Sequence, residues 1–251
     1  MYINARACFT RYSSSHHALK MYKSVSKRIS NTVFSVFIAL TAYISSGNLA
    51  QAQDIKGDAA NGKAKNAMCI GCHGIVGLQA SFPEIHKVPK ISGQSGAYIV
   101  AALQAYKNGD RKHPTMRGIA KSLTEQDIHD LAAFYTDHGV DNRPALGKQP
   151  NIEPNANVEA LLKKGGCVAC HGENYAKPIA AAYPKIAGQH ADYLYVALKA
   201  YKTEKNPVAA RNNPVMVGMV KQFSLSELKE ISKYIGSLNG DLVTISQTRF
   251  K

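Results

Sequence analysis

CIGCHG at residues 69–74 and CVACHG at residues 167–172 are the two stretches that decide the fold of this chain. Each sets two cysteines three positions apart, with a histidine directly after the second one. Together they use four of the five cysteines in the chain. The pattern C-x-x-C-H is the attachment signature of a c-type haem, because two thiols can anchor the porphyrin while the adjacent histidine reaches the iron.

The sequence therefore predicts two covalent haem c groups. The residues expected to hold them are Cys69, Cys72 and His73 in the first motif, and Cys167, Cys170 and His171 in the second. A disulfide would not account for the histidine, and a thioredoxin-like redox pair expects a βαβ context that is absent here. A four-cysteine zinc site expects about 15–20 residues between its two cysteine pairs, whereas Cys72 and Cys167 are 95 apart.

Two longer segments are also written twice along the chain. PKISGQSGAYIVAALQAYK (89–107) returns as PKIAGQHADYLYVALKAYK (184–202), and RKHPTMRGIAKSLTEQDIHDLAAFY (111–135) returns as RNNPVMVGMVKQFSLSELKEISKYI (211–235). A repeat at two copies indicates a duplicated domain pair. The proline-containing stretch DNRPALGKQPNIEP at 141–154 is the expected linker. We predict domain 1 at 53–140 and domain 2 at 155–251.

The periodicity of apolar residues indicates helices and no strand of useful length. Helices are expected over 99–106 and 124–138, in the matching segment that begins at Ser224, and in the segments 58–68 and 157–166 that lead into the motifs. Thr124 with Asp127, and Ser224 with Glu227, have the spacing of a capping box.

Met116 and Met216 are the predicted sixth ligands of the two irons. They occupy the same place in the repeat, 47 and 49 residues after the first cysteine of their motifs, in a segment expected to be a loop or short turn. Met219 is the rival in the second half, but its counterpart is Ile119, which cannot ligate a metal.

Two prolines are predicted to support the histidines. An iron-bound histidine usually donates its other ring N–H to a fixed acceptor. Pro89 and Pro184 lie 16 and 13 residues after the histidines, where a rigid backbone would hold a carbonyl. The alternative is a pair of ordinary turn prolines.

The first 52 residues have the features of a cleaved signal peptide. Six basic residues and no acidic residue precede an apolar run at 33–44, and Ala50 and Ala52 form an A-x-A cleavage site. The run is short for a membrane span, which needs roughly 20 residues, although an uncleaved anchor is the alternative. The mature chain has 25 basic and 17 acidic residues, a net charge of +8. Export argues against nucleic acid as the partner, and the net charge favours solubility and docking on acidic protein surfaces.

With these motifs, the sequence resembles the dihaem cytochromes c of the cytochrome c4 family. The residues that carry the resemblance are the two CxxCH motifs, PKISGQ with PKIAGQ, and RKHPTM with RNNPVM, and it covers about residues 54–240. It implies an all-α fold of two tandem class-I-like cytochrome c domains related by a pseudo-twofold. It also implies His/Met ligation, with His73 and Met116 on one iron and His171 and Met216 on the other.

The resemblance further implies a periplasmic electron carrier, with no catalytic constellation, that passes single electrons from a quinol-oxidising complex toward a terminal oxidase. Two other functions stay open: a dihaem subunit of a dehydrogenase complex, and a dihaem peroxidase-type enzyme. The paired methionines disfavour the enzyme, because it needs an exchangeable iron position, but they do not separate carrier from subunit. Loose membrane association also stays open. The tail GDLVTISQTRFK (240–251) has no place in the family pattern.

Overall fold

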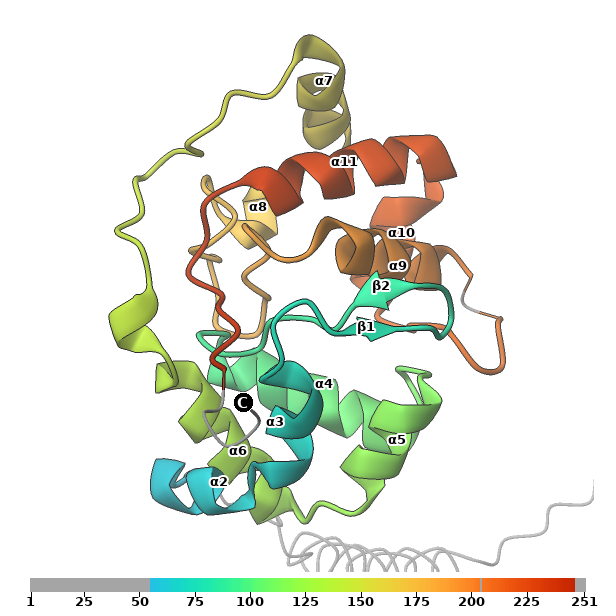
Figure 1. Ribbon diagram of the computed structural model, residues 1–251. Helices are drawn as coiled ribbons and strands as arrows, with labels where there is room; N and C mark the ends of the chain where they lie inside the picture. Colours follow the sequence, from blue (N-terminus) through green and yellow to red (C-terminus); the bar gives the residue numbers. More distant parts are fainter. Residues whose placement is uncertain (1–54, 204, 247–251) are drawn as a thin grey trace, which may run out of the picture. The chain divides into compact units, whose positions relative to one another are not determined.

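A computed structural model describes residues 55–203 and 205–246, which belong to one compact unit beginning at Asp54 (Figure 1). The predicted signal peptide at 1–52 lies outside the described residues. In the part that is described, no helix has the length and apolar character needed to cross a membrane.

Most of the described chain is helical, in two halves that repeat the same order of elements (Figure 1). The helices of the first half are α2 (Ala59–Lys65), α3 (Ala67–His73), α4 (Gly96–Asn108), α5 (Pro114–Lys121) and α6 (Glu125–Asp137). Those of the second half are α7 (Ala156–Gly165), α8 (Val168–His171), α9 (Ala191–Lys202), α10 (Pro214–Lys221) and α11 (Leu225–Ser237).

The remaining elements are short. The two-residue strands β1 (Gln79–Ala80) and β2 (His86–Lys87) pair antiparallel, with Gln79 opposite Lys87, and η1 (Val140–Asn142) is a single 3₁₀ turn at the start of the linker. The prediction of an all-α fold of duplicated domains is confirmed, and this hairpin is a small addition to it.

The predicted capping boxes are confirmed, but the single helix expected over 58–68 is two, since α2 ends at Lys65 and α3 begins at Ala67. Thr124 and Asp127 form a capping box at the start of α6, and Ser224 and Glu227 form the matching box at the start of α11. In each box the hydroxyl oxygen and the carboxylate accept backbone N–H groups that the helix leaves unpaired. Gly109 ends α4 with a left-handed φ of 95°, a conformation that costs glycine little.

The expectation of a loop or short turn around the paired methionines was wrong. Met116 and Met216 each lie at the third position of an eight-residue helix, α5 or α10, whose first residue is a proline. Proline fixes φ near the helical value and needs no N–H partner at that position. The preceding side chain caps the helix, since the N–H of Met116 bonds to His113 Nδ1 at 3.5 Å and that of Met216 to Asn213 Oδ1 at 3.2 Å.

Each half has its own hydrophobic core, built around the helix with the capping box. In the first half, Ile128, Leu131 and Tyr135 of α6 pack with Ile99 of α4. In the second half, α11 and α9 supply the equivalent residues, joined by residues of α7: Leu228, Ile231, Ile235, Leu194, Val158, Leu161 and Leu162.

Helix α2 packs closely on α6 in the first half, with a buried carboxylate at the contact. A Cβ at Gly62 would lie only 2.1 Å from the carbonyl oxygen of Asp130, so glycine is what allows the approach. The Asp130 side chain is fully buried and accepts from the Asp58 N–H at 2.9 Å, the Gln126 amide at 2.8 Å and Lys65 Nζ at 3.2 Å. The repeat places Glu230 at the equivalent position of α11, where it is exposed and accepts from Asn157 Nδ2 at 2.5 Å.

Replacing Asp130 with alanine is expected to destabilise the protein by about 1–3 kcal/mol, because three donors lose a charged acceptor and hydrogen bonds to charged groups are among the stronger ones. Glu230→Ala is the matched control, expected to stay within about 0.5 kcal/mol since the site is exposed. Denaturant unfolding of the two haem-loaded variants measures both values. Equal losses would contradict the assigned role of the buried carboxylate.

The two halves are joined by a reciprocal pair of glutamines. Gln94 accepts from the Lys185 N–H at 2.9 Å and donates to the Lys185 carbonyl oxygen at 3.0 Å. Gln189 makes the same two bonds with Lys90, at 3.0 and 2.9 Å. Gln94 and Gln189 are the last residues of PKISGQ and PKIAGQ. Because each copy of the repeated segment binds the other in the same way, the halves are related by a pseudo-twofold.

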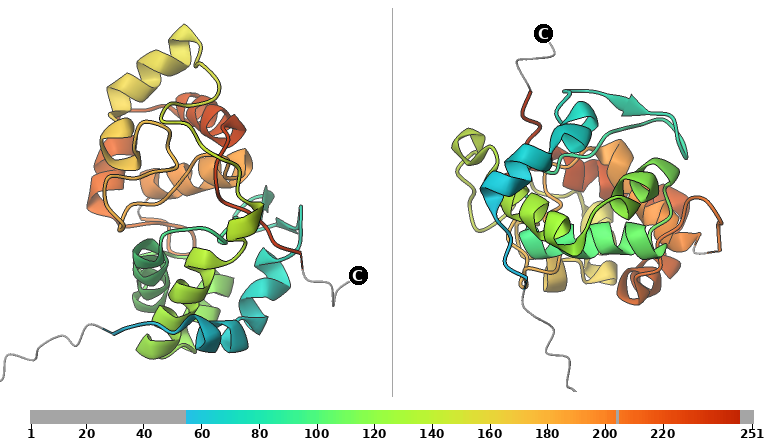
Figure 2. Two further views of the ribbon diagram at one scale, coloured as in Figure 1. Left: turned by 90° about the vertical axis from the view of Figure 1, so that its left-hand side faces the viewer. Right: turned by 90° about the horizontal axis from the view of Figure 1, so that it is seen from below.

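The C-terminal segment 240–246 leaves the second half and runs along the first (Figures 1 and 2). The Val243 N–H donates to the Ser92 carbonyl oxygen at 3.0 Å, and Leu242 is buried. Asp241 Oδ2 lies 2.6 Å from Lys185 Nζ. At Gly93, whose φ is +88°, an added Cβ would lie 2.5 Å from the Asp241 carbonyl oxygen.

Gly93→Ala should therefore displace the C-terminal segment. Gly109→Ala is the control, since Gly109 is also left-handed, with φ +95°, but a Cβ there would have no neighbour within 4 Å. Both variants should lose roughly 1–2 kcal/mol of stability, because alanine is strained in the left-handed conformation, and Gly93→Ala should lose more. Thermal unfolding and limited digestion with a broad-specificity protease compare them. If residues 241–246 are cleaved at the same rate in both variants, the segment is not held at Gly93.

Candidate haem-binding sites

Helix α3 places the three groups of the first motif on one side of a helix. Cys69, Cys72 and His73 stand at positions i, i+3 and i+4, which are neighbours on a helical surface. In the second motif Cys167 precedes α8 but has helical angles, φ −58° and ψ −39°, and accepts the His171 N–H at 3.1 Å. The spacing C-x-x-C-H thus folds into one helical turn in both halves.

Each motif histidine is held by a backbone carbonyl of the repeated PKI segment. His73 Nδ1 lies 2.8 Å from the Pro89 oxygen, and His171 Nδ1 lies 2.9 Å from the Pro184 oxygen. A carbonyl can only accept, so Nδ1 carries the proton and donates. The lone pair of Nε2 is then free, which is the form of imidazole that binds a metal.

The surroundings of the histidines also favour the neutral ring. Burial lowers the pKa of His73 and of His171 below the ordinary value, and the hydrogen bonds to Pro89 and Pro184 only partly oppose this. Both rings therefore stay uncharged at neutral pH and can donate a lone pair.

The four motif cysteines are all free thiols. Cys72 is exposed, and the other three are half-buried. Burial raises the pKa of Cys69 to about 11, and it raises that of Cys167 as well. Attachment of haem c converts each thiol into a thioether, and these neutral thiols next to a histidine fit that chemistry.

The two predicted methionine ligands are half-buried, on the short helices α5 and α10. Met216 packs against the core of the second half, as does Cys167. Met219, one turn further along α10, is 41% exposed. Met216 is therefore more buried than Met219. Met216 is also the methionine that has a counterpart in the first half.

Three other histidines have partners of their own. His113 caps α5, and His86 is buried with Nδ1 2.7 Å from the Glu84 carbonyl oxygen. His138 Nδ1 lies 2.8 Å from Ser92 Oγ. These contacts give each ring a local structural role.

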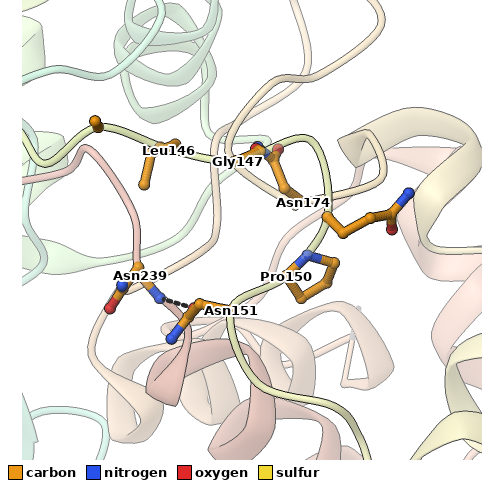
Figure 3. A pocket seen from close by; sticks show the side chains of 8 residues that line it. Leu146, Gly147, Pro150, Asn151, Asn174 and Asn239 are labelled. Atoms are coloured by element: carbon orange, nitrogen blue, oxygen red, sulfur yellow. Dashed lines mark hydrogen bonds between the residues drawn. The ribbon is translucent and has the colours of Figure 1, made fainter.

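A small pocket lies between the linker and the second half (Figure 3). Its volume is about 60 Å³, and its lining residues are Ala145, Leu146, Gly147, Gln149, Pro150, Asn151, Asn174 and Asn239. The Asn239 N–H donates to Asn151 Oδ1 at 2.6 Å across it. Linker and loop residues line this pocket, so it is separate from the cysteine motifs.

Two arginines that the sequence reasoning did not single out are buried at the contact of the halves. Arg111 and Arg211 are matched in the repeat, five residues before Met116 and Met216. Their shared place in RKHPTM and RNNPVM was the available signal, but a charged residue in such a segment is most often exposed.

The donor set fits haem c better than a zinc site. Each half offers two thiols and one oriented imidazole on a single helical turn. Across residues 55–203 and 205–246, no three His, Cys, Asp or Glu side chains come together as metal ligands. A zinc site of four cysteines would require such a cluster.

Known proteins with similar sequences agree with this donor set. A family model described as cytochrome c matches residues 59–136 and 155–239, one segment for each motif. Cytochrome c4 of Azotobacter vinelandii is 32% identical over 202 residues, which cover 73% of this chain and 90% of that protein. A thiosulfate dehydrogenase electron acceptor of Stutzerimonas stutzeri is 28% identical over 182 residues, 68% of this chain and 78% of that protein.

A solved structure is similar as well. Reduced recombinant cytochrome c4 from Pseudomonas stutzeri superposes with a TM-score of 0.52 and 27% identity, over 72% of this chain and 99% of that one. The chain therefore belongs to the cytochrome c family and, within it, to the cytochrome c4 proteins, which carry two covalently bound haem c groups.

Proposed function

We propose that this protein is a periplasmic dihaem carrier that accepts single electrons from one respiratory partner and passes them on toward a terminal oxidase. The observation that carries the proposal is the hydrogen bond from each motif histidine to a proline carbonyl, found in both halves. It orients two imidazoles in the same way and leaves Nε2 of each as a metal ligand.

The residues proposed to hold the haems are those predicted from the sequence. Cys69 and Cys72, and likewise Cys167 and Cys170, would form the thioethers, and His73 and His171 would bind the irons. Met116 and Met216 would each supply a second protein ligand to the iron of their half. When bound, haem c supplies an iron that cycles between its ferrous and ferric states, and a His/Met pair favours a high reduction potential.

Two other functions compete with the carrier: a peroxidase-type enzyme and a dihaem subunit of a dehydrogenase. A peroxidase-type enzyme needs an iron position that a substrate can reach, and a methionine on a capped helix at both sites disfavours it. A dihaem subunit that accepts electrons from a dehydrogenase has support from the relative named as a thiosulfate dehydrogenase electron acceptor. The two roles share the same ligands, so they differ only in the electron donor.

The net charge supports the proposed kind of partner, and the predicted signal peptide supports the proposed location. The predicted mature chain has a net charge of +8, which favours docking on acidic surfaces and a rate that falls with salt. The predicted signal peptide at 1–52 supports the periplasm, with cleavage after Ala52.

Met216→Leu should abolish the sulfur–iron charge-transfer band of one haem and lower its reduction potential, because the iron loses its thioether ligand. Met219→Leu should change neither, since swaps between methionine and an alkyl side chain of similar size are mild. Near-infrared absorbance and a potentiometric titration measure both properties. If the Met219 variant loses the band and the Met216 variant keeps it, the assignment of the ligand in the second half is wrong.

Carbon monoxide and peroxide distinguish carrier from enzyme. Both irons are expected to be six-coordinate and low-spin, so the fully reduced protein should bind carbon monoxide slowly and weakly and should not turn over peroxide. The titration is made at neutral pH on protein whose intact mass equals residues 53–251 plus two haems. Rapid stoichiometric binding at either iron, together with peroxidase turnover, would favour the enzyme.

A further inference from the structure

The two halves meet along their backbones at a matched pair of arginines. Arg111 and Arg211 form an antiparallel bridge. On either side of it, the Lys112 N–H donates to the Ala210 carbonyl oxygen at 2.7 Å, and the Asn212 N–H donates to the Asp110 carbonyl oxygen at 2.9 Å. The backbone hydrogen bonds therefore follow the same pseudo-twofold as the glutamine pair and fix the two arginines next to each other.

Each guanidinium lies among tyrosines of its own half. Arg111 Nη1 donates to the Tyr98 hydroxyl at 3.3 Å, and the guanidinium carbon lies 4.6 Å from the ring centroid of Tyr106. Arg211 Nη2 donates to the Tyr193 hydroxyl at 3.1 Å, and its guanidinium lies 5.4 Å from the ring of Tyr201. The four tyrosines are matched in the repeat, so each guanidinium has the same types of neighbour in its own half.

Neither arginine has an acidic partner in the described part of the chain. Arg111 is 8% exposed and Arg211 is 9% exposed. Every ion pair formed by residues 55–203 and 205–246 uses a lysine, and the buried Nε of Arg111 lacks a hydrogen-bond acceptor. Two adjacent buried cations without an anion are costly, because each has lost its hydration and they repel each other.

The neighbouring groups respond to this uncompensated charge. Burial raises the pKa of the Tyr193 hydroxyl, yet the guanidinium groups of Arg211 and Arg111 outweigh burial and lower it below its ordinary value. At the matched Tyr98 burial prevails and the pKa is raised, although the same two guanidinium groups oppose it. Arg111 and Arg211 each stand two residues before the residue that caps the helix carrying Met116 or Met216, so both arginines lie close to a proposed iron ligand.

We propose that Arg111 and Arg211 form one cationic site, shared by both halves, that binds propionate carboxylates of the two haems. The proposal rests on the proposed function, since it requires haem at both motifs. The propionates are the anionic groups that haem brings, and a guanidinium matches a carboxylate in charge and in its planar pair of donors.

A shared site has a consequence that two separate sites would lack. A positive charge near an iron disfavours its ferric state, because that state carries one more positive charge than the ferrous state. Since the two guanidinium groups are adjacent, each should act on both irons. Both arginines are therefore positioning residues for electron transfer, and each should influence the reduction potentials of both haems.

The test compares four variants of the full, haem-loaded protein: Arg111→Gln, Arg211→Gln, Arg111→Lys and Lys112→Gln. The last is the control, because it removes a neighbouring cation whose Nζ donates to the carbonyl oxygen of the exposed Asn206. Potentials of the two haems are measured by spectroscopic redox titration. Arg111→Gln and Arg211→Gln should each shift both potentials downward, Arg111→Lys should retain most of the wild-type values, and Lys112→Gln should shift them least.

Three results would overturn the proposal. The first is an Arg111→Gln variant whose potentials equal those of Lys112→Gln. The second is a shift confined to one haem, because the site would then not be shared. The third is an equal shift in Arg111→Lys and Arg111→Gln, because the effect would then come from packing and not from charge. Intact mass and the sulfur–iron band of the wild type are recorded first, and a protein without two haems or that band would overturn the proposed function itself.

Discussion

The hydrogen bond between each motif histidine and a proline carbonyl is the interaction on which the rest of the structure depends. Pro89 accepts from His73 and is followed directly by Lys90, whose backbone binds Gln189 of the other half. Pro184 and Lys185 repeat the arrangement with His171 and Gln94. One short segment in each half thus orients a metal-binding ring and also joins the two halves. The position of the imidazole and the contact between the halves therefore cannot change independently.

Duplication has kept this arrangement while the surrounding helices have diverged. On α6 a buried aspartate, Asp130, ties down α2, whereas the equivalent Glu230 on α11 is exposed. In the second half α7 instead supplies buried leucines to the core. The glycine after the histidine also differs in backbone conformation between the halves. Gly172 has φ +79°, and a side chain there would clash with the Lys177 carbonyl oxygen. Gly74 has a negative φ. The conserved element between the halves is the ligand geometry, and the leading helices are supported by different means.

Local patterns in the sequence predicted much of this fold, but they could not predict contacts between distant segments. The capping boxes at Thr124 and Ser224 are signals within four residues, so their helices were found correctly. The helices that carry Met116 and Met216 were missed, because an eight-residue element with a proline at its start has little periodicity to detect. The burial of Arg111 and Arg211 depends on contacts between segments 100 residues apart, which no local pattern records. The haem ligands themselves stay predictions from the motif and the repeat.

The C-terminal segment also affects the order in which the fold can be completed. Val243 binds Ser92, and Ile245 lies against Gly139 at the end of the first half. During synthesis the first half emerges long before residues 240–246 do. Its surface at Ser92 and Gly139 therefore stays uncovered until residues 240–246 arrive. The half that is made first is completed by a segment that follows the second half.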